Sequence, residues 1–137
     1  MIKANELRIG NLIQGEEIGE VIKIDITDGR HILTSEEDGG GEDDFYPILL
    51  TEEWLLKFGF EWETEEKNHI QLSLPDKNLY PESKITFYQL GKSIDIHCQL
   101  YQSGYLDGMF TTFAVKYVHQ LQNLYFSLTN EELTLKS

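Results

Sequence analysis

The sequence predicts an α+β fold in which antiparallel β-strands are combined with two helices. Short runs of alternating apolar and polar residues, separated by glycine-containing turns, recur along the chain and are typical of antiparallel strands. Apolar residues at helical spacing occur twice, at 51–59 and at 115–128. With 137 residues, 40% of them hydrophobic, the chain is long enough for one domain or two small subdomains.

Residues 1–50 are predicted to form a first, β-rich subdomain. Its strands are expected at 7–13, with an interruption at Gly10 and Asn11 as at a bulge or tight bend, and at 18–26, 31–34 and 45–50. The Asp28-Gly29 pair is a hairpin signal, and the alternation in 18–26 places Ile22, Ile24 and Ile26 on one face. Short strands joined by such turns favour a small barrel of the Src-homology or Tudor type, with a plain three-stranded meander as the alternative.

Residues 51–137 are predicted to form a second, α+β subdomain that begins with a short helix. Thr51 is a suitable N-cap, Glu52 and Glu53 suit the positive end of the helix dipole, and Gly59 can adopt the left-handed conformation that ends a helix. Five antiparallel strands are expected at 60–65, 69–74, 85–90, 93–100 and 109–115. The helix at 115–128 is expected to cover one face of this sheet.

The C-terminal helix combines a predicted buried stripe with a polar row. The stripe consists of Val118, Leu121, Leu124, Tyr125 and Leu128, with His119 and Gln122 toward its flanks. The polar row is a candidate partner-binding surface, because amide side chains both donate and accept hydrogen bonds, and consists of Lys116, His119, Gln120 and Asn123. A solvated helix face is the alternative. A capping-box pattern after Thr129 predicts a short second helix that ends near Leu135.

The net charge of −13 is concentrated in the first half of the chain. Residues 1–66 contain 18 acidic and 5 basic residues, whereas residues 67–137 contain 6 of each. A strongly acidic half repels polyanions, so direct binding to a nucleic-acid backbone is not expected. The opposite role, imitation of a polyanion toward a basic partner protein, stays open.

The loop at 35–44 is the most acidic segment. Its acids surround three consecutive glycines and consist of Glu36, Glu37, Asp38, Glu42, Asp43 and Asp44. Their spacing does not match a calcium-binding loop, and flexible glycines would make ion binding costly in conformational entropy. The loop is predicted to be a solvated hairpin tip, with a partner-binding loop or a weak divalent-cation site as the alternative.

Residues that often carry catalytic chemistry do not form a recognisable motif. Cys98 is the only cysteine, the four histidines lie on different predicted elements, and no glycine-rich phosphate loop is present. Asp95 and His97 share one predicted strand face, but no nucleophile accompanies them. We therefore expect no cofactor and no metal. The lone cysteine, and the lack of a signal-peptide pattern or of an apolar run long enough for a membrane span, favour the cytoplasm.

Several stretches resemble the motifs of a known protein family. They are Leu-Arg-Ile-Gly-Asn at 7–11, Pro-Ile-Leu-Leu-Thr-Glu-Glu-Trp-Leu at 47–55, His-Gln-Leu-Gln-Asn-Leu-Tyr-Phe at 119–126 and Leu-Thr-Asn-Glu-Glu-Leu at 128–133. The chain is thereby similar to a family of small uncharacterised bacterial proteins that occur near phages and other mobile elements. The resemblance implies an accessory role in such elements, and it implies no activity and no site residues.

Three hypotheses for function follow. The first is a non-enzymatic module that binds a protein partner or self-associates, through the polar row or the acidic loop. The second is an acidic mimic of nucleic acid that inhibits a DNA- or RNA-binding protein. The third is a hydrolase or metal enzyme, which would require histidines and carboxylates to converge in a pocket.

Overall fold

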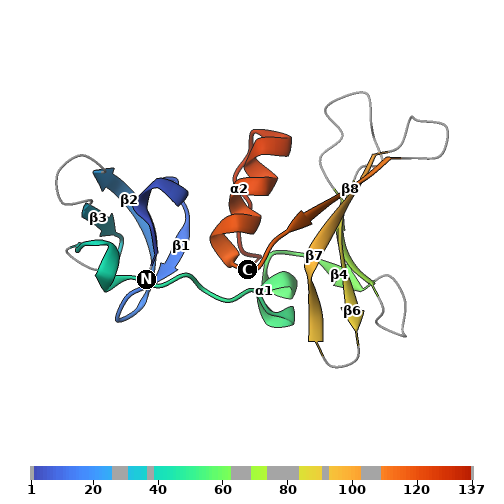
Figure 1. The fold of residues 1–137 in the computed structure, drawn as a ribbon, viewed down its shortest axis with the longest axis horizontal. Helices are drawn as coiled ribbons and strands as arrows, with labels where there is room; N and C mark the ends of the chain where they lie inside the picture. Colours follow the sequence, from blue (N-terminus) through green and yellow to red (C-terminus); the bar gives the residue numbers. More distant parts are fainter. Residues whose placement is uncertain are drawn as a thin grey trace. The chain divides into compact units, whose positions relative to one another are not determined.

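The structure is a computed structural model that describes residues 2–25, 31–36, 39–62, 69–73, 84–90, 93–102 and 109–136. It consists of two compact units (Figure 1). Unit 1 contains Met1–Leu49 and Tyr117–Glu132, and unit 2 contains Leu50–Lys116 and Leu133–Ser137. Both units combine antiparallel strands with helices, so the predicted α+β class is confirmed.

Unit 1 is built on a three-stranded antiparallel sheet with the order β1-β2-β3. The strands are β1 (Leu12–Gln14), β2 (Ile18–Asp25) and β3 (His31–Thr34), and two 3₁₀ helices accompany them, η1 (Ala4–Glu6) and η2 (Glu42–Asp44). This is the meander, one of the two predicted alternatives, and no closed barrel is found among the described residues. The predicted first strand is reduced to Leu12–Gln14, since the chain turns at Ile9 and Gly10, close to the bend predicted at Gly10 and Asn11.

A β-bulge in β2 changes which isoleucines are buried. The pairing of β2 with β3 shifts between Val21 and Lys23, so Val21 pairs with Thr34 and Ile24 pairs with Ile32. An extra residue in one strand reverses the alternation of side chains after it. The prediction that Ile22 and Ile24 share a face is therefore wrong: Val21 is buried, Ile24 packs against the core and Ile22 is 48% exposed. Ile26 lies outside the described residues.

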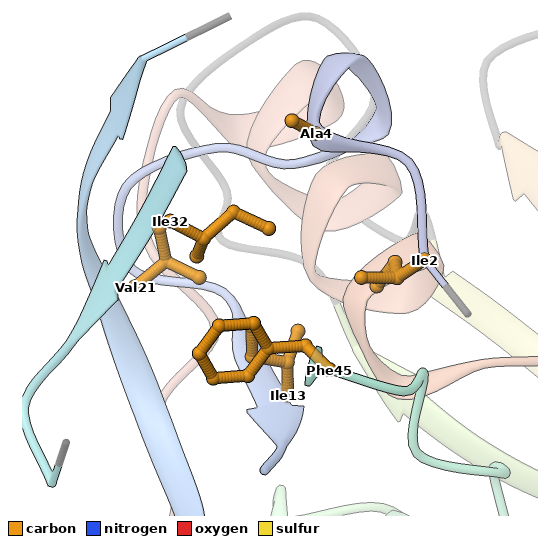
Figure 2. Close-up of a cluster of buried hydrophobic side chains, with 6 residues drawn as sticks. All are labelled: Ile2, Ala4, Ile13, Val21, Ile32 and Phe45. Atoms are coloured by element: carbon orange, nitrogen blue, oxygen red, sulfur yellow. The ribbon is translucent and has the colours of Figure 1, made fainter. Parts of the chain in front are cut away.

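The core of unit 1 draws side chains from both 3₁₀-containing segments and from all three strands. Its buried members are Ile2, Ala4, Ile13, Val21, Ile32 and Phe45 (Figure 2). Each fully buried large apolar side chain stabilises a fold by about 1.5–3 kcal/mol. The predicted strand at 45–50 is reduced to two isolated bridges, in which Tyr46 pairs with Gln14 and Leu49 pairs with Tyr117.

The C-terminal helix, α2 (Val118–Thr129), belongs to unit 1. The predicted division at residue 50 placed it with the second subdomain, whereas in the structure it lies against β1. The helix ends at Asn130, which adopts a left-handed conformation with φ +58°. The short helix predicted after Thr129 is not formed: Thr129 is the last residue of α2 and 131–136 have no helical structure, although the Thr129 hydroxyl accepts a 3.1 Å bond from the Glu131 backbone N–H.

Unit 2 has the predicted order of a short helix followed by five strands. They are α1 (Glu52–Lys57), β4 (Glu61–Trp62), β5 (His69–Ser73), β6 (Lys84–Leu90), β7 (Ser93–Gln102) and β8 (Met109–Ala114). All neighbours in the sheet are antiparallel and follow chain order. Thr51 caps α1 as predicted, since its hydroxyl accepts a bond from the Trp54 N–H. Within the described part of the chain, every helix is too short or too polar to cross a membrane.

Gly59 follows α1 with a φ of +96°, a region that favours glycine. We expect Gly59→Ala to lower the free energy of unfolding by about 1–2 kcal/mol, the cost of a left-handed conformation for an L-residue. The added Cβ would also lie 2.5 Å from Cε of Lys136, but that flexible side chain can move aside. Urea unfolding followed by circular dichroism measures the change. Gly41→Ala is the matched control, because Gly41 has an ordinary φ of −85°; equal effects of the two substitutions would contradict this explanation.

Candidate functional site

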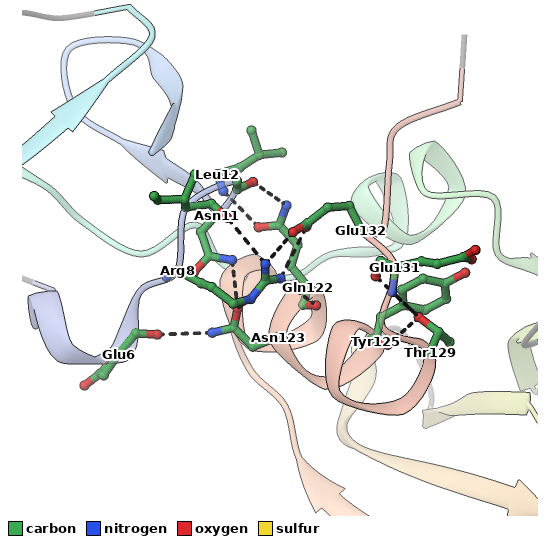
Figure 3. A network of polar contacts seen from close by, with 12 residues as sticks. Glu6, Arg8, Asn11, Leu12, Gln122, Asn123, Tyr125, Thr129, Glu131 and Glu132 are labelled. Atoms are coloured by element: carbon green, nitrogen blue, oxygen red, sulfur yellow. Dashed lines mark hydrogen bonds and ion pairs between the residues drawn. The ribbon is translucent and has the colours of Figure 1, made fainter. Parts of the chain in front are cut away.

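The densest polar network of unit 1 joins the turn before β1 to helix α2 (Figure 3). At its centre Gln122 is only 2% exposed. Its amide oxygen accepts a 2.8 Å bond from the Leu12 backbone N–H, and its amide nitrogen donates a 3.2 Å bond to the Gly10 carbonyl. The Gln122 side-chain amide thus makes hydrogen bonds to the backbone that a neighbouring strand would otherwise make at this edge of β1. We call Arg8, Asn11, Gln122, Asn123 and Glu132 the polar clasp.

Asn123 connects three parts of the clasp. Its amide oxygen accepts bonds from Arg8 Nε at 3.2 Å and from Asn11 Nδ2 at 2.8 Å. Its amide nitrogen donates to the Glu6 carbonyl at 3.1 Å. Asn11 is buried, and its own side-chain oxygen accepts a 2.7 Å bond from the Arg8 backbone N–H. These bonds fix the turn before β1, because each satisfies a polar group that would otherwise have to be hydrated.

All three nitrogens of the Arg8 guanidinium group form hydrogen bonds. It forms an ion pair with both carboxylate oxygens of Glu132, and its Nη2 also approaches the Gln122 carbonyl at 3.4 Å. The centre of the guanidinium lies 4.1 Å from the centroid of the Phe126 ring, a cation–π distance. The side chains of the ion pair are 28% and 41% exposed, so water screens part of its attraction. The arginine therefore acts mainly through hydrogen bonds and packing.

His119 lies in the first turn of α2 and is 1% exposed. Neither ring nitrogen has a hydrogen-bond partner among the described residues, and the nearest charge is the Glu6 carboxylate, 3.6 Å from Nε2. The imidazole stacks on the Tyr117 ring, with centroids 5.9 Å apart. Burial lowers the pKa of His119, because the charged form loses hydration, and the neighbouring Glu6 opposes this shift only in part. The folded protein therefore favours neutral imidazole.

This arrangement predicts that the folded protein becomes less stable in mild acid. In the unfolded chain the histidine has its ordinary pKa of about 6.5, so below that pH it binds a proton that the buried side chain of the folded protein does not bind. The free energy of unfolding should therefore fall as pH drops below about 6.5, by at most about 1.4 kcal/mol per pH unit. Urea unfolding of the wild type and of His119→Phe between about pH 8 and pH 5 measures this component.

The phenylalanine variant should lose that component of the pH dependence. His31→Gln is the control, since His31 is exposed and the substitution should leave the slope in place. If the free energy of unfolding of His119→Phe depends on pH as strongly as that of the wild type, a group other than His119 causes the dependence.

The predicted polar row of α2 is largely used within the protein. His119 is buried, Asn123 belongs to the clasp, and the Gln120 side chain accepts a 3.0 Å bond from the Tyr117 backbone N–H at the helix start. Lys116 is exposed but precedes the helix and belongs to unit 2. Helical spacing alone could not reveal the bonds of Gln122 to Leu12 and of Asn123 to Asn11, because these partners lie more than 100 residues away in the sequence.

The acidic loop is partly ordered by its own carboxylates. Glu42 accepts a 2.6 Å bond from the Ala4 backbone N–H, and Asp44 accepts a 2.9 Å bond from the Gly41 N–H at the start of η2. Asp43 and Asp44 are exposed, as is Glu36 after β3. Glu37 and Asp38 lie outside the described residues. The loop is therefore more structured than a freely solvated hairpin tip over 42–44.

The sequence-based predictions about metal and catalytic groups are tested only in part. Within the described ranges, no three His, Cys, Asp or Glu residues lie close enough to hold a metal ion together. The side chains of His69, Asp95, His97 and Cys98 fall outside the described part of the chain.

A second surface of unit 1 was missed by the sequence reasoning. It is the face of the sheet opposite the core, where large apolar side chains are exposed among acids. The residues Gln14, Ile18, Glu20, Ile22 and Tyr46 define what we call the outer face. Tyr46 is 55% exposed, Ile18 43% and Ile22 48%. The only signal for this face in the sequence was the alternation of apolar and polar residues in β2, and the bulge interrupts that alternation.

The charge of the chain is distributed unequally between the two units. Unit 1 contains 14 acidic and 4 basic residues, a net charge of −10, whereas unit 2 carries the remaining −3. The outer face therefore belongs to a unit with a strongly negative potential.

Comparisons of the chain with protein-family models, with curated proteins and with solved structures find no match.

Proposed function

We propose that this protein is a non-enzymatic interaction module that binds a protein partner through unit 1. The observation that carries the proposal is the exposure of Ile18, Ile22 and Tyr46 on a unit with a net charge of −10. Single exposed apolar residues are common, but several on one sheet face mark an interaction surface more often. Tyrosine in particular is frequent among residues that dominate binding energy.

The polar clasp supports this assignment by its position. Its groups bond to one another and to the backbone, so they hold α2 against β1. A rigid scaffold lowers the entropy that a surface loses on binding. The clasp is thus the framework of the module, and the outer face is its contact surface.

The setting of the module is part of the same proposal. We propose an accessory role in a phage or another mobile element from the resemblance of the stretches at 7–11, 47–55, 119–126 and 128–133 alone, since the comparisons with known proteins find no match. The single cysteine supports the reducing cytoplasm as the place where the protein works.

The test is affinity capture followed by reconstitution. The full chain is immobilised beside an unrelated protein of similar negative charge, and proteins from host cells retained only by the chain are identified by mass spectrometry. We expect one protein that rebinds in purified form with a defined stoichiometry in isothermal titration calorimetry. The proposal is contradicted if nothing is enriched over the acidic control and the chain is a monomer by light scattering.

A second candidate function is that of an acidic mimic that inhibits a nucleic-acid-binding protein. The observation in its favour is the net charge of −10 on unit 1, to which exposed acids in the β1–β2 turn, in β2, after β3 and in η2 contribute. A surface of this charge attracts the basic sites that bind phosphates.

Competition distinguishes the mimic from a general interaction module. If the captured partner binds DNA or RNA, a fluorescent duplex of that nucleic acid should be displaced from it by the chain. Displacement at a one-to-one ratio supports the mimic. A ternary complex of partner, duplex and chain would rule the mimic out and leave the interaction module in place.

A further inference from the structure

We infer that the outer face binds a basic segment of a partner protein that also carries apolar side chains. This inference rests on the proposed function and names the site and the chemistry of its partner. It follows from the register of the sheet, from the order of acids and apolar residues, and from the charge of unit 1.

The register places Tyr46 and Ile18 in one row, on either side of Gln14. Gln14 of β1 pairs with Ile18 of β2 on one side and with Tyr46 on the other. Directly opposed residues of antiparallel strands project to the same face, with Cβ atoms about 4.5–5.5 Å apart. Tyr46, Gln14 and Ile18 therefore form a row roughly 10 Å long. Ile22 lies further along β2 and is exposed as well.

Acidic residues alternate with the members of this row along the chain. Glu16 and Glu17 precede Ile18, Glu20 lies between Ile18 and Ile22, and Asp43 and Asp44 precede Tyr46. Glu20 pairs with Leu12 in the register, which places the carboxylate on the same face as Ile18. All five acids are exposed. Two exposed apolar side chains, Tyr46 and Ile18, thus lie on one face with Glu20, and four more exposed acids are close by in the chain. This combination is the complement of a segment in which Lys or Arg alternates with apolar residues.

The same charge argues against other occupants. A second copy of the chain on this face would bring two units of net charge −10 together, and like charges across an interface are costly. A polyanion would be repelled for the same reason. A basic partner is attracted over a distance of about one Debye length, and the apolar contacts then supply the affinity.

The experiment uses two fluorescent peptides of equal positive charge and the full chain. One peptide repeats Arg-Leu-Ser, and the other repeats Arg-Ser-Ser, so they differ only in apolar content. Fluorescence anisotropy measures each Kd. We expect the leucine-containing peptide to bind about tenfold more tightly than the Arg-Ser-Ser peptide. Both peptides should bind more weakly as NaCl rises from about 50 mM to about 500 mM.

Variants then locate the binding site. Tyr46→Ser and Ile18→Ser should each weaken binding of the leucine-containing peptide by about tenfold, the effect of removing one central apolar contact. The matched control is Ile9→Ser, because Ile9 is 60% exposed but lies in the turn before β1, outside the outer face. The Kd of the leucine-containing peptide for Ile9→Ser should stay within about twofold of its Kd for the wild type. Circular dichroism verifies that each variant is folded.

The inference is overturned if both peptides bind equally, or if Ile9→Ser weakens binding as much as Tyr46→Ser does. It is also overturned if neither peptide binds. In each case the capture experiment still decides whether the protein has a stoichiometric partner, so failure of the inferred partner chemistry is separable from failure of the proposed function.

Discussion

Gln122→Leu should be among the most destabilising single substitutions in unit 1. The leucine side chain has a similar size, but the Leu12 N–H and the Gly10 carbonyl both lose the partner that the glutamine amide gives them. A buried polar group left without a hydrogen bond costs about 1–3 kcal/mol. Since both backbone groups are only partly shielded from water, we expect a loss of about 2–3 kcal/mol in the free energy of unfolding. Urea unfolding followed by circular dichroism measures it.

Gln120→Leu is the matched control on the same helix. Gln120 accepts a bond from the Tyr117 backbone N–H at the helix start, and loss of a bond at this position costs about 1 kcal/mol. Hydrogen exchange of the Leu12 amide provides a local readout, which should accelerate in Gln122→Leu and not in Gln120→Leu. Equal stability of the two variants would show that the glutamine does not hold α2 to β1.

Arg8→Lys should destabilise unit 1 by about 2 kcal/mol, although the charge is kept. A lysine ammonium cannot reach Asn123, Glu132 and the Gln122 carbonyl at once, and it loses the planar contact with the Phe126 ring. The ion pair itself contributes little of this effect because its side chains are partly exposed. The free energy of unfolding at low and at high salt separates the two contributions.

The control for Arg8→Lys is Glu53→Gln, which breaks the exposed pair between Lys57 and Glu53 in α1 and leaves Lys57 over the Trp54 ring. An exposed pair at this spacing contributes about 0.3–0.5 kcal/mol, and salt removes it. The loss in Arg8→Lys should persist at high salt, since hydrogen-bond geometry and packing cause it. A loss that disappears with salt would mean that the arginine acts only as a charge.

The local signals of the sequence predicted much of the fold. Thr51 caps α1, Gly59 has a positive φ, and the strands of unit 2 lie within a few residues of their predicted bounds. Each of these depends on neighbours in the chain, through a capping hydroxyl, a backbone conformation or a regular alternation. Such features can be read without knowledge of the tertiary structure.

The contacts of α2 could not be predicted in the same way. Helical periodicity treats glutamine, asparagine and histidine as solvent-facing, yet Gln122 and His119 are buried and Asn123 is bonded on both ends of its amide. Whether a polar side chain is buried depends on the groups around it, and the groups that satisfy Gln122 and Asn123 belong to residues 6–12. The structure brings the stretches 7–11 and 119–126 together through the bonds of Arg8 and Asn11 to Asn123.

The outer face could not be predicted from the sequence because β2 contains a bulge. A regular strand over 18–26 would have put Ile22 and Ile24 on the same side, and the bulge after Val21 separates them. Bulges have no strong sequence signal in the absence of glycine. The exposed row of Tyr46, Gln14 and Ile18 also depends on a bridge between residues 32 positions apart, which no local pattern encodes.

A nuclear magnetic resonance titration of the isotope-labelled full chain with the leucine-containing basic peptide shows whether the outer face is the binding site. Binding to the outer face predicts that the amide signals of Gln14, Ile18, Glu20, Ile22 and Tyr46 shift together and saturate with one Kd. The signals of the clasp residues Gln122 and Asn123 should move far less. Shifts centred on unit 2, or on α2 with the outer face unchanged, would contradict the account.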